Sequence, residues 1–308
     1  MKTVKPTRLL PTLFFISMFL FTCNQNGEEI ASATVTINGV DLYYEIVGKG
    51  EPLVLIHGNG GDRRHWDEQF LPLSKDFQVI RYDVRCYGKS VFTNSDIEFS
   101  HHDDLKVLLD HLEIERAHIC GLSMGSGIAV DFALAYPKRC RSLIPIGSWA
   151  NGYGTGDFVT PASDSLFSIM GKVASIASEI GIGSATDYFW TGNDQFKNTI
   201  RLPRTIEKMK TIGYDYSFWN FINPTKQMVY QPLAITALDK IKIPTLIVIG
   251  EYDLEVCNEI ADLMEEKIED AKKIIIKDSG HIMNMDQPAE FNRLVTALMK
   301  EQVILEFN

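Results

Sequence analysis

Residues 121–125 read Gly-Leu-Ser-Met-Gly, which is the spacing of a nucleophile elbow. A short strand pattern precedes this segment, and a helical pattern follows it over residues 126–136 and stops at Pro137. Such a turn places the serine at the N-terminus of a helix, where free backbone N–H groups and the helix dipole favour developing negative charge. The strand–turn–helix context therefore predicts that Ser123 is a catalytic nucleophile rather than part of an ordinary small-residue turn.

A serine hydroxyl needs a base within hydrogen-bond reach and a group that orients the base. In chains with an elbow of this kind the order is nucleophile, acid, histidine. Asp253 follows the strand pattern at 245–249, and His281 follows the strand pattern at 273–277. Because catalytic groups gather at the carboxyl ends of parallel strands, both side chains are expected to converge on Ser123. The predicted triad has Ser123 as nucleophile, His281 as general base and acid, and Asp253 as the orienting group.

Other ionisable side chains near these motifs are assigned structural roles. Glu251 is expected on the surface of the loop that carries Asp253, and Asp278 is expected to point away from the imidazole. His57 is expected to brace its own loop through ring hydrogen bonds rather than to act as a base. The remaining histidines are expected in solvent on a polar helix (His101, His102 and His111), at the rim or in a structural role (His65), and in or beside the strand before the elbow (His118).

Acyl transfer also needs donors aimed at the developing oxyanion, and the loss of one donor costs ~10² to 10³ in turnover. The backbone N–H of Met124, directly after the nucleophile, is the first predicted donor. The second is expected from residues 57–61, which read His-Gly-Asn-Gly-Gly after a strand pattern. Because the glycines let this backbone turn its amides toward the site, Asn59 is the predicted second donor, with Gly60 as the alternative.

The order and spacing of these motifs resemble the α/β-hydrolase superfamily over residues 35–298. The resemblance implies an α/β fold, with a mostly parallel twisted sheet, helices on both faces and an inserted helical cap. It also implies a serine hydrolase that needs no cofactor and no metal. Haloalkane dehalogenases and epoxide hydrolases of this fold have an aspartate where Ser123 stands, and proline iminopeptidases usually have a tryptophan where Met124 stands, so these subgroups are disfavoured.

Residues 83–90 resemble a further segment of that family, Asp-x-Arg-Gly-x-Gly-x-Ser, but Cys86 replaces its first glycine. This substitution predicts a bend that does not need a glycine-only conformation. The wide spacing of Cys86 and three other cysteines gives no disulfide framework, so all four are expected to be mostly free thiols. The other three are Cys120, Cys140 and Cys257. The cysteines and histidines show no metal-ligand spacing.

Alternating and apolar runs predict the elements that position these residues. Runs at 33–37 and 40–47 flank Asn38-Gly39, which is a strong hairpin signal. Apolar runs typical of strands covered on both faces follow at 53–56, 77–82, 117–120, 143–146, 245–249 and 273–277. Helical patterns cover 100–112, 126–136, 255–267 and 289–300. This alternation predicts one core made of residues 33–148 and 240–308.

Residues 149–239 form an insertion that is far longer than a simple crossover needs. They are predicted to fold as a helical cap over the catalytic edge. The insertion is rich in aromatic residues, and any single one of them is expected in the core of the cap itself. Together they predict an apolar pocket for an acyl or aryl group.

The N-terminus reads as an export signal of the lipoprotein type over residues 1–22. Basic residues precede an apolar stretch at 9–21, which is too short to span a bilayer comfortably. Cys23 is the predicted lipidated residue, and residues 23–32 are the predicted tether. The protein is therefore expected in the bacterial cell envelope through this lipid anchor, with plain secretion or an uncleaved anchor as the alternatives.

The composition excludes one class of partner. The net charge is −10, and no basic run suggests nucleic-acid binding. The predicted function is a serine hydrolase that cleaves an ester-type bond of a small, partly apolar acyl substrate through an acyl-enzyme, as carboxylesterases and lactonases do. The alternatives are a carbon–carbon bond hydrolase or perhydrolase that uses the same site, and a hydrolase-like receptor with slow turnover.

Overall fold

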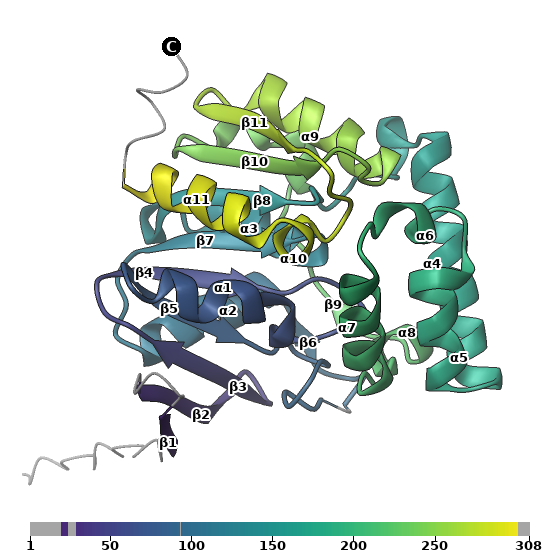
Figure 1. Ribbon diagram of the computed structural model, residues 1–308, viewed down its shortest axis with the longest axis horizontal. Coiled ribbons are helices and arrows are strands. Elements are labelled where there is room, and N and C mark those ends of the chain that lie inside the picture. Colours follow the sequence, from purple (N-terminus) through teal and green to yellow (C-terminus); the bar gives the residue numbers. More distant parts are fainter. Residues whose placement is uncertain (1–19, 24–28, 93, 301–308) are drawn as a thin grey trace, which may run out of the picture.

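The computed structural model describes residues 20–23, 29–92 and 94–300 of the chain. Within these residues a nine-stranded sheet forms the centre of the molecule, in the order β1-β2-β3-β5-β4-β7-β8-β10-β11 (Figure 1). In this spatial order, the neighbours from β1 through β2 and β3 to β5 pair antiparallel. All neighbours from β5 through β4, β7, β8 and β10 to β11 pair parallel. The predicted α/β fold with a mostly parallel sheet is therefore confirmed.

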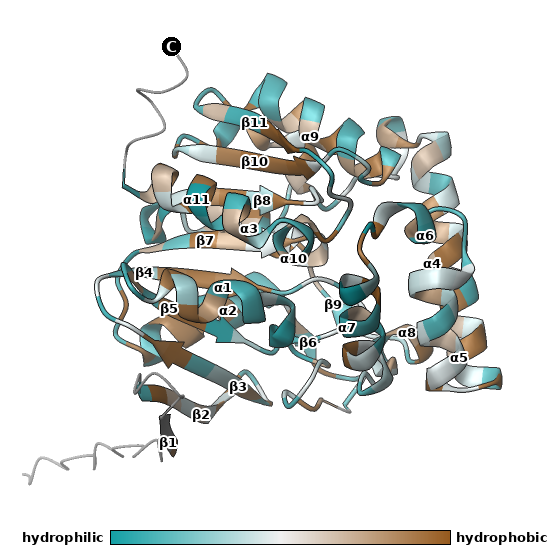
Figure 2. Cartoon of the chain, viewed as in Figure 1, coloured by the Kyte–Doolittle hydropathy of each residue, from teal (hydrophilic) through white to brown (hydrophobic). Residues whose placement is uncertain are grey.

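The strands of this sheet form the centre of the buried core. They are β1 (Leu20–Cys23), β2 (Glu29–Ile37), β3 (Val40–Val47), β4 (Glu51–Ile56), β5 (Phe77–Tyr82), β7 (Ala117–Leu122), β8 (Cys140–Ile146), β10 (Thr245–Gly250) and β11 (Ala271–Ile276). Every residue of β7 and β10 is buried, as expected of parallel strands that are covered on both faces. Figure 2 shows hydrophobic colour along these strands and hydrophilic colour on the outer surfaces of the helices.

Helices cover the sheet and set its layers. On one face α1 (Asp67–Leu73), α10 (Met283–Asp286) and α11 (Pro288–Met299) contact one another (Figure 1). On the other face α2 (His101–His111) packs with α3 (Met124–Ala135), and α9 (Glu255–Lys267) packs against β10 and β11. Short 3₁₀ helices at Arg63–Trp66, Pro137–Arg139, Gly156–Phe158, Ala234–Thr236 and Leu238–Lys240 complete the connections.

The predicted strands and helices of the core are present, with ends that differ by a few residues. The hairpin turn between β2 and β3 shows why its sequence signal was strong. Asn38 and Gly39 have φ angles of 45° and 78°, and a two-residue turn with positive φ at both positions matches the twist of the two strands. All four cysteines assigned as free thiols are free and buried.

Two of the histidines that were expected in solvent are instead buried. His101 and His102 lie at the start of α2, and β9 (Lys226–Gln227), which pairs with β6 (Glu98–Phe99), brings Gln227 into hydrogen-bond contact with His101. The ring of Phe99 packs 5.2 Å from that of His101, and burial lowers the pKa of His101 to about 3. The sequence pattern missed this because β9 is more than a hundred residues away in the chain.

The chain between β8 and β10 forms a helical insertion beyond the carboxyl ends of the parallel strands (Figure 1, right side). It contains α4 (Pro161–Glu179), α5 (Ile182–Asp187), a π-helical turn (Tyr188–Gly192), α6 (Phe196–Thr199), α7 (Pro203–Tyr214) and α8 (Trp219–Ile222). The start of α4 is fixed by a capping box in which Thr160 and Ser163 bond each other's backbone N–H, followed by Pro161 at the first helical position.

The N-terminal predictions fall largely outside the described residues, because residues 1–19 and 24–28 hold most of the predicted signal peptide and part of the predicted tether. Residues 20–23 form β1, which pairs with β2. Since β2 begins at Glu29, the last part of the predicted tether belongs to a strand. No helix among the described residues is long and apolar enough to cross a bilayer.

Candidate active site

Ser123 lies on a sharp turn between β7 and α3. Its φ is 54° and its ψ is −112°, a strained backbone that non-glycine residues rarely adopt. Neighbouring glycines make the turn possible, because a Cβ on Gly121 would lie 2.0 Å from the carbonyl oxygen of Gly125. A Cβ on Gly125 would lie 2.3 Å from the carbonyl oxygen of Ile56. The sequence therefore holds Ser123 at the carboxyl edge of the sheet through close backbone contacts.

Asp253 and His281 meet beside this turn. The Nδ1–H of His281 donates to Oδ1 of Asp253 at 2.6 Å, and the two side chains are 3% and 0% exposed. The backbone N–H of Leu254 donates to the same oxygen at 2.7 Å. These bonds hold the imidazole in the tautomer whose Nε2 has a free lone pair, which is the form a general base needs.

The alternative acidic candidates do not orient this imidazole. Glu251 is exposed, and its carboxylate accepts the backbone N–H of Asp278 at 2.9 Å. Asp278 is itself exposed. The structure thus places Asp253 at the imidazole and the other two acids on the outer surface of their loops.

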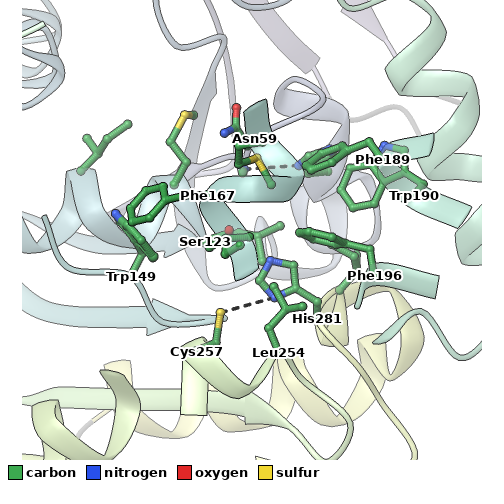
Figure 3. A pocket seen from close by; sticks show the side chains of 18 of the residues that line it. Asn59, Ser123, Trp149, Phe167, Phe189, Trp190, Phe196, Leu254, Cys257 and His281 are labelled. Atoms are coloured by element: carbon green, nitrogen blue, oxygen red, sulfur yellow. Dashed lines mark hydrogen bonds between the residues drawn. The ribbon is translucent and has the colours of Figure 1, made fainter. Parts of the chain in front are cut away.

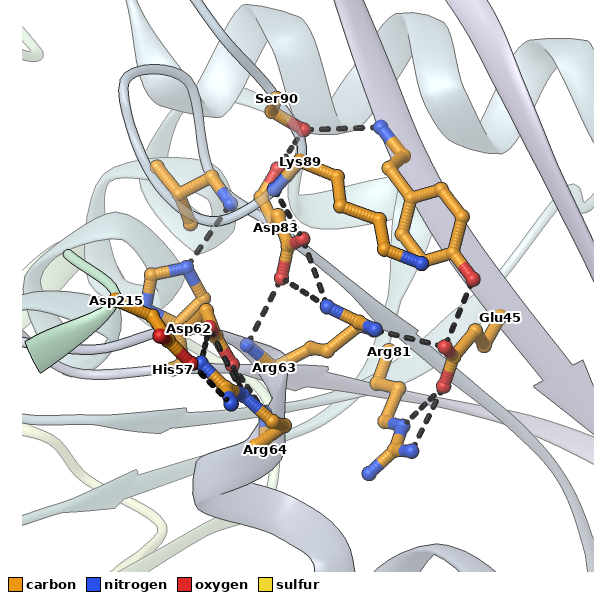
Figure 4. A network of polar contacts seen from close by, with 12 residues as sticks. Glu45, His57, Asp62, Arg63, Arg64, Arg81, Asp83, Lys89, Ser90 and Asp215 are labelled. Atoms are coloured by element: carbon orange, nitrogen blue, oxygen red, sulfur yellow. Dashed lines mark hydrogen bonds and ion pairs between the residues drawn. The ribbon is translucent and has the colours of Figure 1, made fainter. Parts of the chain in front are cut away.

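The loop of residues 57–61, which carries the predicted oxyanion donor, is held by His57. Its Nδ1–H donates to the carbonyl of Gly58 at 2.8 Å, and its Nε2 accepts the N–H of Val84 at 3.0 Å. Burial lowers the pKa of His57, so the ring is neutral and braces the loop as predicted. Arg63 extends the network by pairing with both Asp83 and Glu45 (Figure 4).

Cys86 corrects one expectation from the sequence. Its φ is 76°, in the left-handed region that favours glycine, so the prediction that this bend does not need such a conformation is wrong. The bend is held closed by the N–H of Cys86, which donates to the carbonyl of Ser90 at 3.0 Å. Burial raises the pKa of the Cys86 thiol to about 12, which leaves it uncharged.

Asn59 is tied to the cap through Tyr87. The Tyr87 hydroxyl donates to Oδ1 of Asn59, and the side-chain amide of Asn220 donates to the Tyr87 oxygen at 2.9 Å. The ring of Tyr216 stacks on that of Tyr87, with centroids 4.8 Å apart. Since Asn220 and Tyr216 belong to the insertion, the cap helps to fix the loop that carries the predicted oxyanion donor.

The cap also contacts His281 directly. The backbone N–H of His281 donates to the carbonyl of Thr199 at 2.9 Å, and the ring of Phe196 lies edge-on, 5.7 Å from the imidazole. Gly280 permits this approach. Sequence reasoning missed Thr199 and Phe196, because a backbone carbonyl and a single aromatic residue in a helical insertion leave no motif.

A cavity of about 190 Å³ brings the predicted site residues together (Figure 3). Ser123, His281, Asn59 and Met124 all line it, whereas Asp253 lies behind the imidazole. Most of its wall is apolar, and it comes from both the core and the cap: Leu122, Ile128, Trp149, Leu166, Phe167, Met170, Phe189, Trp190, Phe196, Leu254 and Ile282. None of the described lining residues is Lys, Arg, Asp or Glu.

A twisted parallel sheet with a serine elbow and a buried His–Asp pair at its carboxyl edge defines a hydrolase of the α/β class. The family model for the alpha/beta hydrolase fold matches residues 51–288, and the chain belongs to this family. A curated relative, 3-oxoadipate enol-lactonase 1 of Acinetobacter baylyi, is 26% identical over 277 residues, which cover 89% of this chain and 98% of that protein.

Two solved structures are similar in fold. The esterase EaEST from Exiguobacterium antarcticum has a TM-score of 0.72 and 21% identity, over 87% of this chain and 98% of that one. The meta-cleavage product hydrolase CumD from Pseudomonas fluorescens has a TM-score of 0.67 and 23% identity, over 87% of this chain and 97% of that one. At this level of identity both support the fold and leave the substrate to be argued from the site.

Replacing Gly280 with alanine should lower both turnover and stability, because the added Cβ would lie 1.2 Å from the carbonyl oxygen of Thr199. Either the cap or the loop of His281 must move, and overpacking of this kind costs about 1–3 kcal/mol. Gly171→Ala is the matched control, since a Cβ on this residue of α4 meets nothing within 4 Å. Steady-state kinetics and urea unfolding measure both effects. A Gly280→Ala variant with wild-type turnover and stability would contradict the close contact.

Proposed function

We propose that the protein is a serine hydrolase that cleaves an ester-type bond of a small, neutral, partly apolar substrate. The observation that carries this proposal is the buried His281–Asp253 pair, which lies beside Ser123 at an apolar cavity with no charged wall residue among those described. The similarity to an enol-lactonase supports an ester-type bond, because a lactone is a cyclic ester.

The reaction would run through an acyl-enzyme. Ser123 Oγ attacks the carbonyl carbon while Nε2 of His281 takes its proton, and the buried carboxylate of Asp253 stabilises the imidazolium. The backbone N–H groups of Met124 and Asn59 bind the oxyanion; the side-chain oxygen of Asn59 is already engaged by Tyr87. His281 then protonates the leaving alcohol, and water hydrolyses the acyl-enzyme by the same steps in reverse order.

The size and polarity of the cavity limit the substrate. An apolar engineered cavity of about 150 Å³ holds a benzene molecule, so a cavity of about 190 Å³ suits an aryl group or a short acyl chain. A carboxylate on that chain would lose its hydration and find no cationic partner, which costs several kcal/mol per ion. The site therefore favours neutral acyl groups over acyl groups that carry a carboxylate.

Methyl hexanoate and monomethyl adipate test this selectivity, because they differ only in the terminal group of the acyl chain. We expect kcat/KM to be at least about 100-fold higher for the neutral ester, as measured by pH-stat titration, since 2.7 kcal/mol of lost hydration suffices for that ratio. Ser123→Ala should lower ester turnover at least about 10³-fold. Ser148→Ala, which removes another buried hydroxyl away from the cavity lining, should keep it.

The same series of assays distinguishes the proposed esterase activity from the competing chemistries. Rapid cleavage of a 1,3-dione or rapid peracid formation, with only slow ester turnover, would contradict the esterase proposal and favour carbon–carbon hydrolysis or perhydrolysis. One acyl group bound per protein without further turnover would favour a receptor. Equal kcat/KM for the two matched esters would contradict the neutral substrate but leave the ester chemistry standing.

We also propose that the protein is exported and anchored to the bacterial envelope by a lipid on Cys23. Basic residues before the apolar stretch at 9–21, and the position of Cys23 directly after it, support this proposal. Mass spectrometry of the N-terminal peptide from native envelope fractions is expected to show a chain that begins at a lipid-modified Cys23. An unmodified chain that begins at Met1 would contradict it, and an unmodified, shortened chain would indicate plain secretion.

A further inference from the structure

A cysteine lies against the Nδ1 edge of the imidazole of His281. Cys257 belongs to the first turn of α9, which starts directly after the loop of Asp253. Its side chain is buried, and its Sγ lies 3.9 Å from Nδ1 of His281 (Figure 3). Cys257 therefore contacts the same ring nitrogen that bonds to Asp253.

The carboxylate of Asp253 has a second oxygen at this point. Oδ1 accepts both hydrogen bonds described above, whereas Oδ2 is buried and accepts neither of them. One ligand atom each from Asp253, Cys257 and His281 lies within 4.8 Å of the others. Burial, and then the negative charge of Asp253 and a hydrogen bond to its carboxylate, raise the pKa of the Cys257 thiol.

We propose that Asp253, Cys257 and His281 form an inhibitory binding site for a borderline-soft divalent cation such as Zn²⁺. One sulfur, one imidazole nitrogen and one carboxylate oxygen are a donor set that suits Zn²⁺ and does not suit Mg²⁺ or Ca²⁺. Tetrahedral zinc bonds place sulfur and nitrogen about 3.5 Å apart, close to the 3.9 Å separation in this structure. Asp253 must move back from the imidazole by a fraction of an ångström to admit the ion.

The cavity supplies an entry path and a fourth position. Cys257 and His281 both line it, so a cation can arrive from the substrate side and retain a water molecule there. The thiol proton leaves to solvent as the sulfur binds. Nδ1 must also give up its proton to bind the cation, and the neutral ring then carries its proton on Nε2.

This change of tautomer explains why the site would be inhibitory. A ring with a proton on Nε2 has no lone pair for the hydroxyl proton of Ser123, and Asp253 no longer orients it. The inhibition rests on the proposed hydrolase function, whereas the binding of the cation does not. The two can therefore be tested separately.

Titration of the purified full-length protein with Co²⁺ tests the binding. Co²⁺ takes the place of Zn²⁺ in such sites, and a cobalt–thiolate bond gives a charge-transfer band in the near ultraviolet. We expect this band, at one Co²⁺ per protein, in the wild type and in Cys140→Ala, a matched control at another free buried cysteine. Cys257→Ala should lack the band. Cys257→Ser, a second variant that preserves the side-chain volume, should lack it too. Circular dichroism checks that each variant is folded.

Zn²⁺ inhibition of ester turnover tests the consequence, with each variant compared with its own metal-free rate. The inhibitory concentration should rise at least about tenfold in Cys257→Ala, EDTA should restore wild-type turnover, and Mg²⁺ should have no effect. Absence of the cobalt band in the wild type, or equal Zn²⁺ sensitivity of folded Cys257→Ala, would overturn the inference. A cobalt band without any ester turnover would instead count against the proposed function alone.

Discussion

The hydrogen bond between His281 and Asp253 is the interaction on which the proposed chemistry of the site depends. It is 2.6 Å long and almost wholly excluded from water, so it defines the imidazole tautomer far better than an exposed pair would. Its two partners come from loops after β10 and β11, whose parallel register ends at Gly250 and Ile276. The loops touch: a Cβ on Gly250 would lie 2.2 Å from the carbonyl oxygen of Gly280. Two glycines thus let an acid and a base from separate strands meet.

The cap contacts the loop of His281 and is linked to the loop of Asn59. The carbonyl of Thr199 in the cap accepts the backbone N–H of His281. Asn220 of the cap donates to the Tyr87 hydroxyl, which in turn donates to Asn59. The same insertion supplies much of the aromatic wall of the cavity. The insertion that lines the cavity therefore also contacts His281 and the loop of Asn59, so substitutions in the cap are expected to alter turnover as well as substrate preference.

The sequence predicted the parts of this molecule that depend on local patterns. The hairpin at Asn38-Gly39, the apolar central strands and the elbow at Ser123 each have a signal within a few residues, and the chain order of Asp253 and His281 follows from the strands before them. Contacts between distant segments left no such signal. The buried His101 contacts a strand of the returning cap, and the contact of Thr199 with His281 uses only a backbone carbonyl.

One prediction was wrong for a different reason, because residue identity misled the interpretation. Cys86 was read as a sign that its bend does not need a glycine-only conformation, yet its φ of 76° lies in the left-handed region that favours glycine. Cys257 is a free thiol, as predicted. Three residues lie between it and Asp253, whereas His281, the third donor of the proposed cation site, follows another strand. Only the fold shows that the three side chains lie close together.

We propose that the buried pair activates Ser123. Exposure of the full-length protein to a fluorophosphonate probe tests it most directly, with the labelled residue identified by mass spectrometry. We expect covalent labelling at Ser123 in the wild type, none in Ser123→Ala, and labelling slowed at least about 10³-fold in folded His281→Ala. Labelling of Ser123 at the same rate without His281, or no labelling of the folded wild type, would contradict it.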